Sequence, residues 1–308
     1  MPDRLVVDLD RDGQAKVLSW PENGLLPEEV SRAPLAWPLD ADALEDLRWY
    51  LEDYLLAPYG VWEERGPAVR ERLAAWGDQV FSSVFGGGPA RDAYQRMRAQ
   101  GLELIFRSAE PGLLALPWEL MRDGAGPVSL GRGGISRSLL VADGAGMLEV
   151  PGGKLRVLMV ISRPDGTKDV GYQMVARPLL ERLDAVRGEV DLTVLRPPTF
   201  DALREAVKDA AASGEPYHVV HFDGHGAMLG RPAGGGPIAG RPAMMNGQGE
   251  GVLAFEKPAG GSDLISASKV AQVLAAGRVP VVVLNACQSG AVGKELEASV
   301  ATALLKAG

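Results

Sequence analysis

The chain has 308 residues, of which 46% are hydrophobic and 23% are charged, as in an ordinary globular protein. Its formal net charge is −8 and its basic residues form no block, which argues against a nucleic-acid partner. The apolar runs are too short to span a membrane, the N-terminus lacks a secretory signal, and the single cysteine cannot form an internal disulfide, so we expect a cytoplasmic protein without a membrane span.

Residues 1–150 are predicted to form a small α+β region. Two apolar segments flank a turn-like Asp-Arg-Asp-Gly sequence and predict a β-hairpin. Asp40 stands where a helix cap belongs, ahead of apolar residues at helical spacing. The expected elements are the hairpin, two helices and a strand: 5–9 with 15–20, 44–55, 67–85 and 102–106. The tryptophans of this region are expected in its core rather than on a binding surface: Trp37, Trp49, Trp62 and Trp76.

Residues 151–308 are predicted to form a second region in which strands alternate with helices. Nearly continuous apolar runs are typical of strands buried on both faces: 155–161, 190–195, 217–222 and 279–284. Helical patterns follow these runs: 172–187, 200–213, 268–276 and 293–306. Asp201, and either Ser266 or Ser268, are placed as helix caps. The alternation predicts a doubly wound, mostly parallel α/β sheet with flanking helices.

The segment 230–251 interrupts this alternation with eight glycines and three prolines and without apolar periodicity. We therefore expect a long loop there. Loops of this length usually act as functional lids or as disordered spacers. Arg231 and Arg241 are candidate scissile positions if the loop is an activation segment.

Residues able to carry chemistry follow two of the predicted strands. His225 comes after the third strand, and Cys287, the single cysteine, comes after the fourth. Loops that follow parallel strands emerge at one edge of a sheet, so the imidazole and the thiol are expected to meet if these strands are neighbours. A thiol is a good nucleophile only as thiolate, which a nearby imidazole or a helix N-terminus favours. His225 would accept the thiol proton and return it to a leaving amine, while the amides of Gly226 and Cys287 stabilise an oxyanion.

Other interpretations of these residues compete. A lone cysteine is often a small core residue, and a histidine after a strand is often structural. A zinc site from His218, His221 and His225 is disfavoured, because strand alternation puts the first two on opposite faces. Ser289 lacks the Gly-x-Ser-x-Gly context of a serine nucleophile, and the segment 162–166 is neither a dinucleotide-binding nor a P-loop motif. We therefore expect no metal and no cofactor.

Two motifs around the histidine and the cysteine resemble the paired motifs of the CHAT family, which are caspase- and separase-like cysteine peptidases. The motifs are His-Phe-Asp-Gly-His-Gly at 221–226 and Leu-Asn-Ala-Cys-Gln-Ser-Gly at 284–290. Upstream, Leu-Pro-Trp-Glu-Leu at 116–120 resembles another motif of that family, and the likeness begins near residue 102. The resemblance implies a caspase-like catalytic core in the second region.

By the same resemblance, His225 is the general base and acid, Cys287 is the nucleophile, and Gly226 helps to form the oxyanion hole. Neighbouring residues of the two motifs are expected either to support this pair or to face the substrate: His221, Asp223, Gly224, Asn285, Gln288 and Ser289. Charged residues after the strands are candidates for selecting a charged substrate side chain, unless they are simply solvated: Arg163, Lys168, Asp165, Asp169 and Asp223.

The resemblance implies a regulatory cysteine endopeptidase that cleaves a protein or peptide substrate. The family's domain usually continues past the helix that follows the cysteine, so we expect this chain to lack the C-terminal part and to have weak or absent activity alone. Either the chain is a fragment, or a regulatory or completing protein chain supplies the rest. Two alternatives stay open: a non-catalytic interaction module that binds a partner through its N-terminal region, and another thiol enzyme such as an acyltransferase.

Overall fold

The computed structural model describes most of the chain: residues 3–21, 26–52, 54, 64–99, 101–131, 133–140, 153–164, 166, 177, 179, 181–182, 186–229, 250–287 and 304–305. The chain divides into two compact units, with the division in the sequence between Ala142 and Asp143. Each unit contains a mixed sheet and packed helices, so the protein is α/β.

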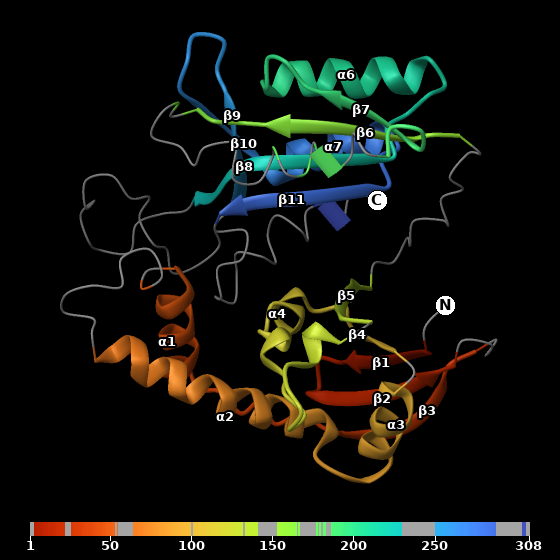
Figure 1. The fold of residues 1–308 in the computed structure, drawn as a ribbon, viewed down its shortest axis with the longest axis vertical. Coiled ribbons are helices and arrows are strands. Elements are labelled where there is room, and N and C mark those ends of the chain that lie inside the picture. Colours follow the sequence, from red (N-terminus) through yellow and green to blue (C-terminus); the bar gives the residue numbers. More distant parts are fainter. Residues whose placement is uncertain are drawn as a thin grey trace. The chain divides into compact units, whose positions relative to one another are not determined.

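The first unit is built on a sheet of five strands in the order β3-β2-β1-β4-β5 (Figure 1). The strands are β1 (Asp3–Leu9), β2 (Gln14–Trp20), β3 (Glu28–Pro34), β4 (Leu102–Ser108) and β5 (Ile135–Leu139). The predicted hairpin is confirmed, since β1 and β2 are antiparallel and Asp10 Oδ1 accepts a hydrogen bond from the Gln14 amide at 2.8 Å. Because β4 pairs with β1 in parallel, the hairpin is joined to a strand distant in sequence.

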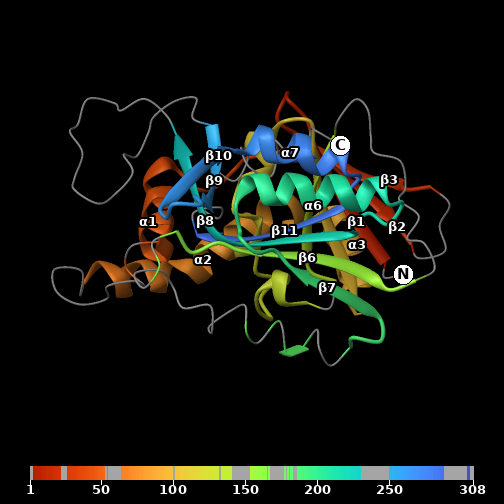
Figure 2. The same ribbon diagram turned by 90° about the horizontal axis from the view of Figure 1, so that it is seen from above.

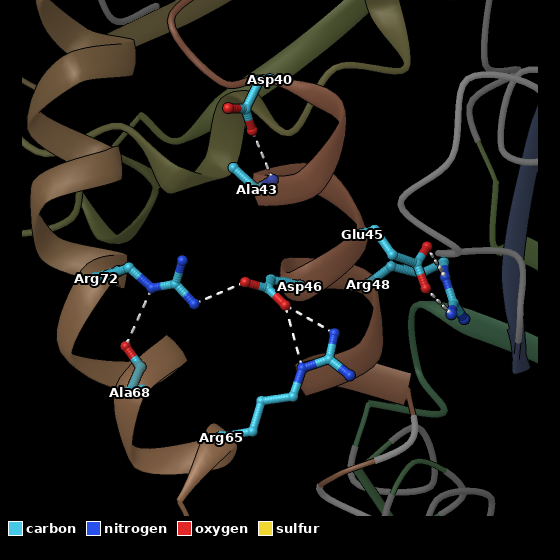
Figure 3. Close-up of polar contacts among 8 residues, drawn as sticks. All are labelled: Asp40, Ala43, Glu45, Asp46, Arg48, Arg65, Ala68 and Arg72. Carbon is cyan, nitrogen blue, oxygen red and sulfur yellow. Dashed lines mark hydrogen bonds and ion pairs between the residues drawn. The ribbon is translucent and has the colours of Figure 1, made fainter.

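The α-helices of this unit are α1 (Ala41–Glu52), α2 (Arg65–Phe85), α3 (Gly88–Arg98) and α4 (Pro111–Leu114). Two short 3-10 helices follow, η2 (Trp118–Leu120) and η3 (Val128–Leu130). The predicted cap is confirmed, because Asp40 Oδ1 accepts from the Ala43 amide at 2.8 Å (Figure 3). Helix α3 was not predicted. It begins inside the glycine-proline segment that ends α2, with Pro89 in its first turn, where a missing N–H costs nothing.

Aromatic side chains form much of the core of the first unit, as predicted. Trp49 and Trp76 are buried, at 5% and 7% exposure. The fully buried Trp118 stacks on Phe106 with a centroid distance of 4.0 Å, and Trp37 meets it edge-on. Trp62 lies outside the described residues.

A carboxylate links α1 to α2 (Figure 3). Asp46 accepts from Arg65 Nη2 at 2.7 Å and from Arg72 Nη2 at 2.6 Å. The two guanidinium groups lie over the rings of Trp49 and Trp76, at 4.1 and 5.0 Å from the centroids. Burial acts to raise the pKa of Asp46, but the hydrogen bonds from both arginines outweigh it and lower that pKa. The ionised carboxylate therefore stabilises the helix pair.

The second unit contains a sheet of six strands: β6 (Leu155–Ile161), β7 (Val190–Val194), β8 (Val219–Leu229), β9 (Glu250–Glu256), β10 (Ser262–Ser266) and β11 (Val281–Cys287). Its order is β10-β9-β8-β6-β7, and β11 pairs with β8. The four predicted strands, β6, β7, β8 and β11, are parallel. The antiparallel hairpin β9–β10 was not predicted, and it makes the sheet mixed. Its turn requires Gly260 and Gly261, both at positive φ.

Two helices, α6 (Phe200–Ala212) and α7 (Ala267–Ala276), run side by side over one face of this sheet (Figures 1 and 2). Apolar residues of both helices pack on alternate residues of the strands: Leu203, Val207, Val270 and Leu274 against Leu158, Val160, Val220 and Phe222. Helix α7 is capped by Ser266, which was one of the two candidate caps, Ser266 and Ser268. The prediction that Asp201 caps α6 is wrong. The Thr199 hydroxyl oxygen accepts the capping hydrogen bond from the Ala202 amide, and Asp201 forms an ion pair with Arg204.

Most of the predicted helices 172–187 and 293–306, and nearly all of the glycine-rich segment, lie outside the described residues. The described residues 177, 179, 181–182 and 304–305 are helical, and residues 186–187 form a turn. Of the glycine-rich segment, Glu250 and Gly251 belong to β9 rather than to a loop. Within the described ranges, no helix combines the length and the hydropathy that a membrane crossing requires.

Candidate active site

The predicted histidine and cysteine lie in neighbouring strands of the second sheet. β8 and β11 pair in parallel, and the register sets Asp223 against Asn285 and His225 against Cys287. Neighbouring strands are about 4.8 Å apart. The condition that the two strands are neighbours is met, and the backbone brings positions 225 and 287 side by side.

The prediction that these residues follow their strands is wrong. β8 continues through His225 to Leu229, and β11 ends on Cys287 itself. The reason is a change of partner. β8 pairs with β6 as far as Asp223 and with the antiparallel β9 from His225 onward, so its ladder does not stop at the Asp-Gly-His-Gly sequence.

One face of β8 carries three polar residues at alternate positions, which are His221, Asp223 and His225. The intervening residues Val220 and Phe222 belong to the core under α6 and α7. The candidate site is therefore on the opposite face from these helices. His225 is half-buried there, and Gly226 follows it in β8, where it pairs with Leu253 of β9.

Asp223 is the buried charge of this face, at 3% exposure. Its Oδ2 accepts from Arg163 Nη2 at 2.8 Å, and its Oδ1 accepts from Asn285 Nδ2 at 2.9 Å. Arg163 Nη1 donates to the backbone carbonyl oxygens of Ser162 and Asp223 at 2.9 and 2.8 Å. Both oxygens of the carboxylate are thus held by side chains from other segments, Asn285 of β11 and Arg163 just after β6.

This geometry corrects the expectation that Arg163 or Asp223 selects a charged substrate side chain or is simply solvated. The two charges compensate each other, and their side chains are only 17% and 4% exposed. A residue that selects a charged ligand must instead offer its charge to that ligand. The other candidates for this role, Lys168, Asp165 and Asp169, lie outside the described residues.

His221 is buried at 9% exposure, and its Nδ1 makes no hydrogen bond within the described part of the chain. Burial lowers the pKa of His221, although the nearby Asp223 carboxylate acts to raise it. The neutral imidazole is therefore favoured at pH 7. His218 has a different environment, since its Nδ1 accepts from the Arg156 amide at 2.9 Å.

Gly224 lies between Asp223 and His225, and the space around it leaves no room for a side chain. A Cβ added there would lie 2.8 Å from the Phe222 ring and 3.3 Å from Ser162 Cβ. This position therefore requires glycine for packing. Gln288 and Ser289 lie outside the described residues, and for Cys287 the structure gives the position in the sheet.

Two supporting contacts were missed by the sequence reasoning. The buried Ser162 hydroxyl donates to the Ala254 carbonyl oxygen at 2.8 Å, and the Arg163 amide donates to Glu256 Oε1 at 2.9 Å. They join the end of β6 to β9, a strand that was itself not predicted. The signal available was the polar pair directly after the apolar run 155–161.

The upstream motif lies in the first unit and has a packing role there. Trp118 Nε1 donates to the Leu113 carbonyl oxygen at 2.9 Å, so the polar atom of this fully buried ring is satisfied. Glu119 forms an ion pair with Arg137 of β5.

Among the described residues, no group of three histidine, cysteine or acidic side chains is arranged to hold a metal ion. In comparisons with known proteins, a family model described as the CHAT domain matches residues 78–308. The match begins within α2, earlier than the motifs indicated. No curated protein and no solved structure matches the chain.

Proposed function

The chain belongs to the CHAT domain family, and from this premise we propose that it is a cysteine endopeptidase that cleaves a protein partner with His225 and Cys287. The observation that carries the proposal is the parallel register of β8 and β11, in which these two positions are partners. Adjacent strands that carry a histidine and the single cysteine of the chain support the proposal, because nucleophilic catalysis by a thiolate requires a base close to the thiol.

In the proposed reaction, His225 takes the proton of the Cys287 thiol and the thiolate attacks the carbonyl carbon of a peptide bond. The backbone amides of Gly226 and Cys287 stabilise the resulting oxyanion. The C–N bond breaks as His225 gives its proton to the leaving amine, and a thioester remains. Water then attacks the thioester with His225 as base, the C–S bond breaks, and the proton returns to the sulfur.

The finer fold assignment belongs to the same proposal. The parallel set β7, β6, β8 and β11, with α6 and α7 on one face, supports a caspase-like doubly wound core. A cytoplasmic location is consistent with the chemistry, since a thiol nucleophile has to stay reduced. A regulatory role, and control by a second protein chain, belong to the same proposal and rest on the family likeness.

The test is the alkylation of Cys287 by iodoacetamide at pH 7, followed by intact mass. The chain has one cysteine, so any adduct reports on this position. An ordinary thiol is only about 3% ionised at this pH. We expect alkylation at least about tenfold faster than in the urea-unfolded chain, and a loss of that advantage in His225→Ala. A slow rate in the folded chain, or an unchanged rate in His225→Ala, overturns the proposal and favours the non-catalytic interaction module.

A second measurement separates hydrolysis from acyl transfer. Incubation with a peptide library, read by mass spectrometry, should yield fragments with new carboxyl termini for the wild type and none for Cys287→Ala. Products in which an added amine captures the acyl group in place of water would favour the acyltransferase.

A further inference from the structure

We propose that Asn285 is a positioning residue, which sets the register of β11 on β8 through its hydrogen bond to Asp223 and thereby holds Cys287 opposite His225. The inference rests on the proposed function, because the consequence of the register is read in the reactivity of Cys287. Asn285 and Asp223 are register partners, and each lies two residues before a member of the proposed catalytic pair. Their side chains are joined at 2.9 Å across the two strands.

The acceptor of this bond is held in place independently of β11. One oxygen of the buried Asp223 carboxylate is occupied by Arg163, which also donates to the Asp223 backbone. The backbone of Arg163 is in turn anchored to Glu256 of β9. The remaining oxygen therefore has a defined position, and Asn285 finds a preoriented acceptor that is part of a charged pair.

On the face that carries the site, the apolar part of β11 specifies its register poorly. Val281 and Val283 of this face are alike, so a shift by two residues exchanges valine for valine, and at 47% and 41% exposure these side chains lose little burial by it. On the other face, Val282, Leu284 and the buried Ala286 pack in the core under α6 and α7. Among the described strands, β11 pairs with β8 alone.

The polar contact is the feature of the site face that distinguishes the correct register. A shift of β11 by two residues would place an apolar residue or Cys287 opposite Asp223 and leave one oxygen of a buried carboxylate without its donor, which is costly. The same shift would separate position 287 from His225. A single polar contact sets the register of helices in coiled coils, and we propose the same role for this contact between strands, where the register is the geometry of the site.

The experiment measures iodoacetamide alkylation of Cys287 at pH 7 in the full chain. We expect Asn285→Ala to slow the reaction at least fivefold, and Asn285→Ser, which also lacks the amide donor, to serve if the alanine variant does not fold. The matched control is Thr199→Ala. It removes the hydrogen bond by which the buried Thr199 caps α6, leaves the β8–β11 contact intact and should keep the wild-type rate.

A double variant tests whether the effect passes through His225. If Asn285 acts by aligning the pair, His225→Ala with Asn285→Ala should react no more slowly than His225→Ala alone. An unchanged rate in Asn285→Ala, with a slow His225→Ala, overturns this inference and leaves the proposed function standing. The inference is also overturned if Asn285→Ala slows alkylation by the same factor in the wild type and in His225→Ala. Such a result would mean that the substitution loosens the structure in general rather than misaligning the pair. If His225→Ala has no effect, the proposed function itself fails.

Discussion

Arg163 holds Asp223 by two separate hydrogen bonds, one to the backbone carbonyl oxygen and one to the carboxylate, each of 2.8 Å. The two bonds attach the second residue after β6 to the middle of β8. The guanidinium group also neutralises the Asp223 carboxylate, which is almost completely buried. The polar side of the second sheet is thus arranged around a compensated ion pair.

Removal of the cation should be strongly destabilising. Arg163→Met leaves Asp223 buried with Asn285 as its remaining side-chain donor, and an uncompensated buried charge costs about 3–5 kcal/mol. Urea unfolding of the full chain measures the loss. Arg163→Lys is the matched control. It keeps the positive charge but not the planar guanidinium group with its several donors, and it should lose less free energy of unfolding than Arg163→Met. A loss under about 1 kcal/mol in Arg163→Met would contradict this account of the pair.

Gly224→Ala should destabilise the second unit by about 1–3 kcal/mol, because the new methyl group overlaps the Phe222 ring and approaches Ser162. Thermal unfolding is the measurement. Gly188→Ala is the control in the same unit, since a Cβ there meets no atom within 4 Å and its φ is not in the left-handed region. Similar melting temperatures for the two variants would show that Gly224 is not required for packing.

Acid should weaken the link between α1 and α2. The pKa of Asp46 is lower in the folded chain than in the unfolded one, so its contribution is present above the unfolded value of about 3.9 and is lost as the pH falls through the folded value. Asp46→Asn should cost about 1 kcal/mol at pH 7, because the two arginines are partly exposed. The difference in stability between the two proteins should shrink as the pH falls below about 3.9. A constant difference from pH 7 to pH 2 would be inconsistent with an ionised link.

His221 should make the second unit less stable in mild acid. Burial lowers its pKa, so the unfolded chain binds the proton more readily and stability falls as the pH drops below about 6.5. His221→Gln removes this group and should flatten the dependence of the melting temperature between pH 7 and pH 5. The difference between the two profiles isolates His221 from the other histidines. An equally steep profile in the variant would exclude His221 as the source.

Local patterns predicted much of the secondary structure. The β1–β2 hairpin, the Asp40 cap, the α7 cap and the four parallel strands were all readable, because turns, caps and apolar runs depend on residues close in sequence. The hairpin β9–β10 was missed because it follows a glycine-rich segment without periodicity. The end of β8 was misplaced because a strand continues wherever a neighbour accepts its hydrogen bonds, and β9 is that neighbour.

The residue types of the site, a histidine and a single cysteine among small residues after apolar runs, are evident in the sequence alone, and so is the family. The tertiary structure decided that positions 225 and 287 are partners in one ladder, and that Asp223 is occupied by Arg163 and Asn285. Charge pairing and strand register depend on which distant segments pack together, and that choice is made by the burial of the whole sheet rather than by any local run of residues.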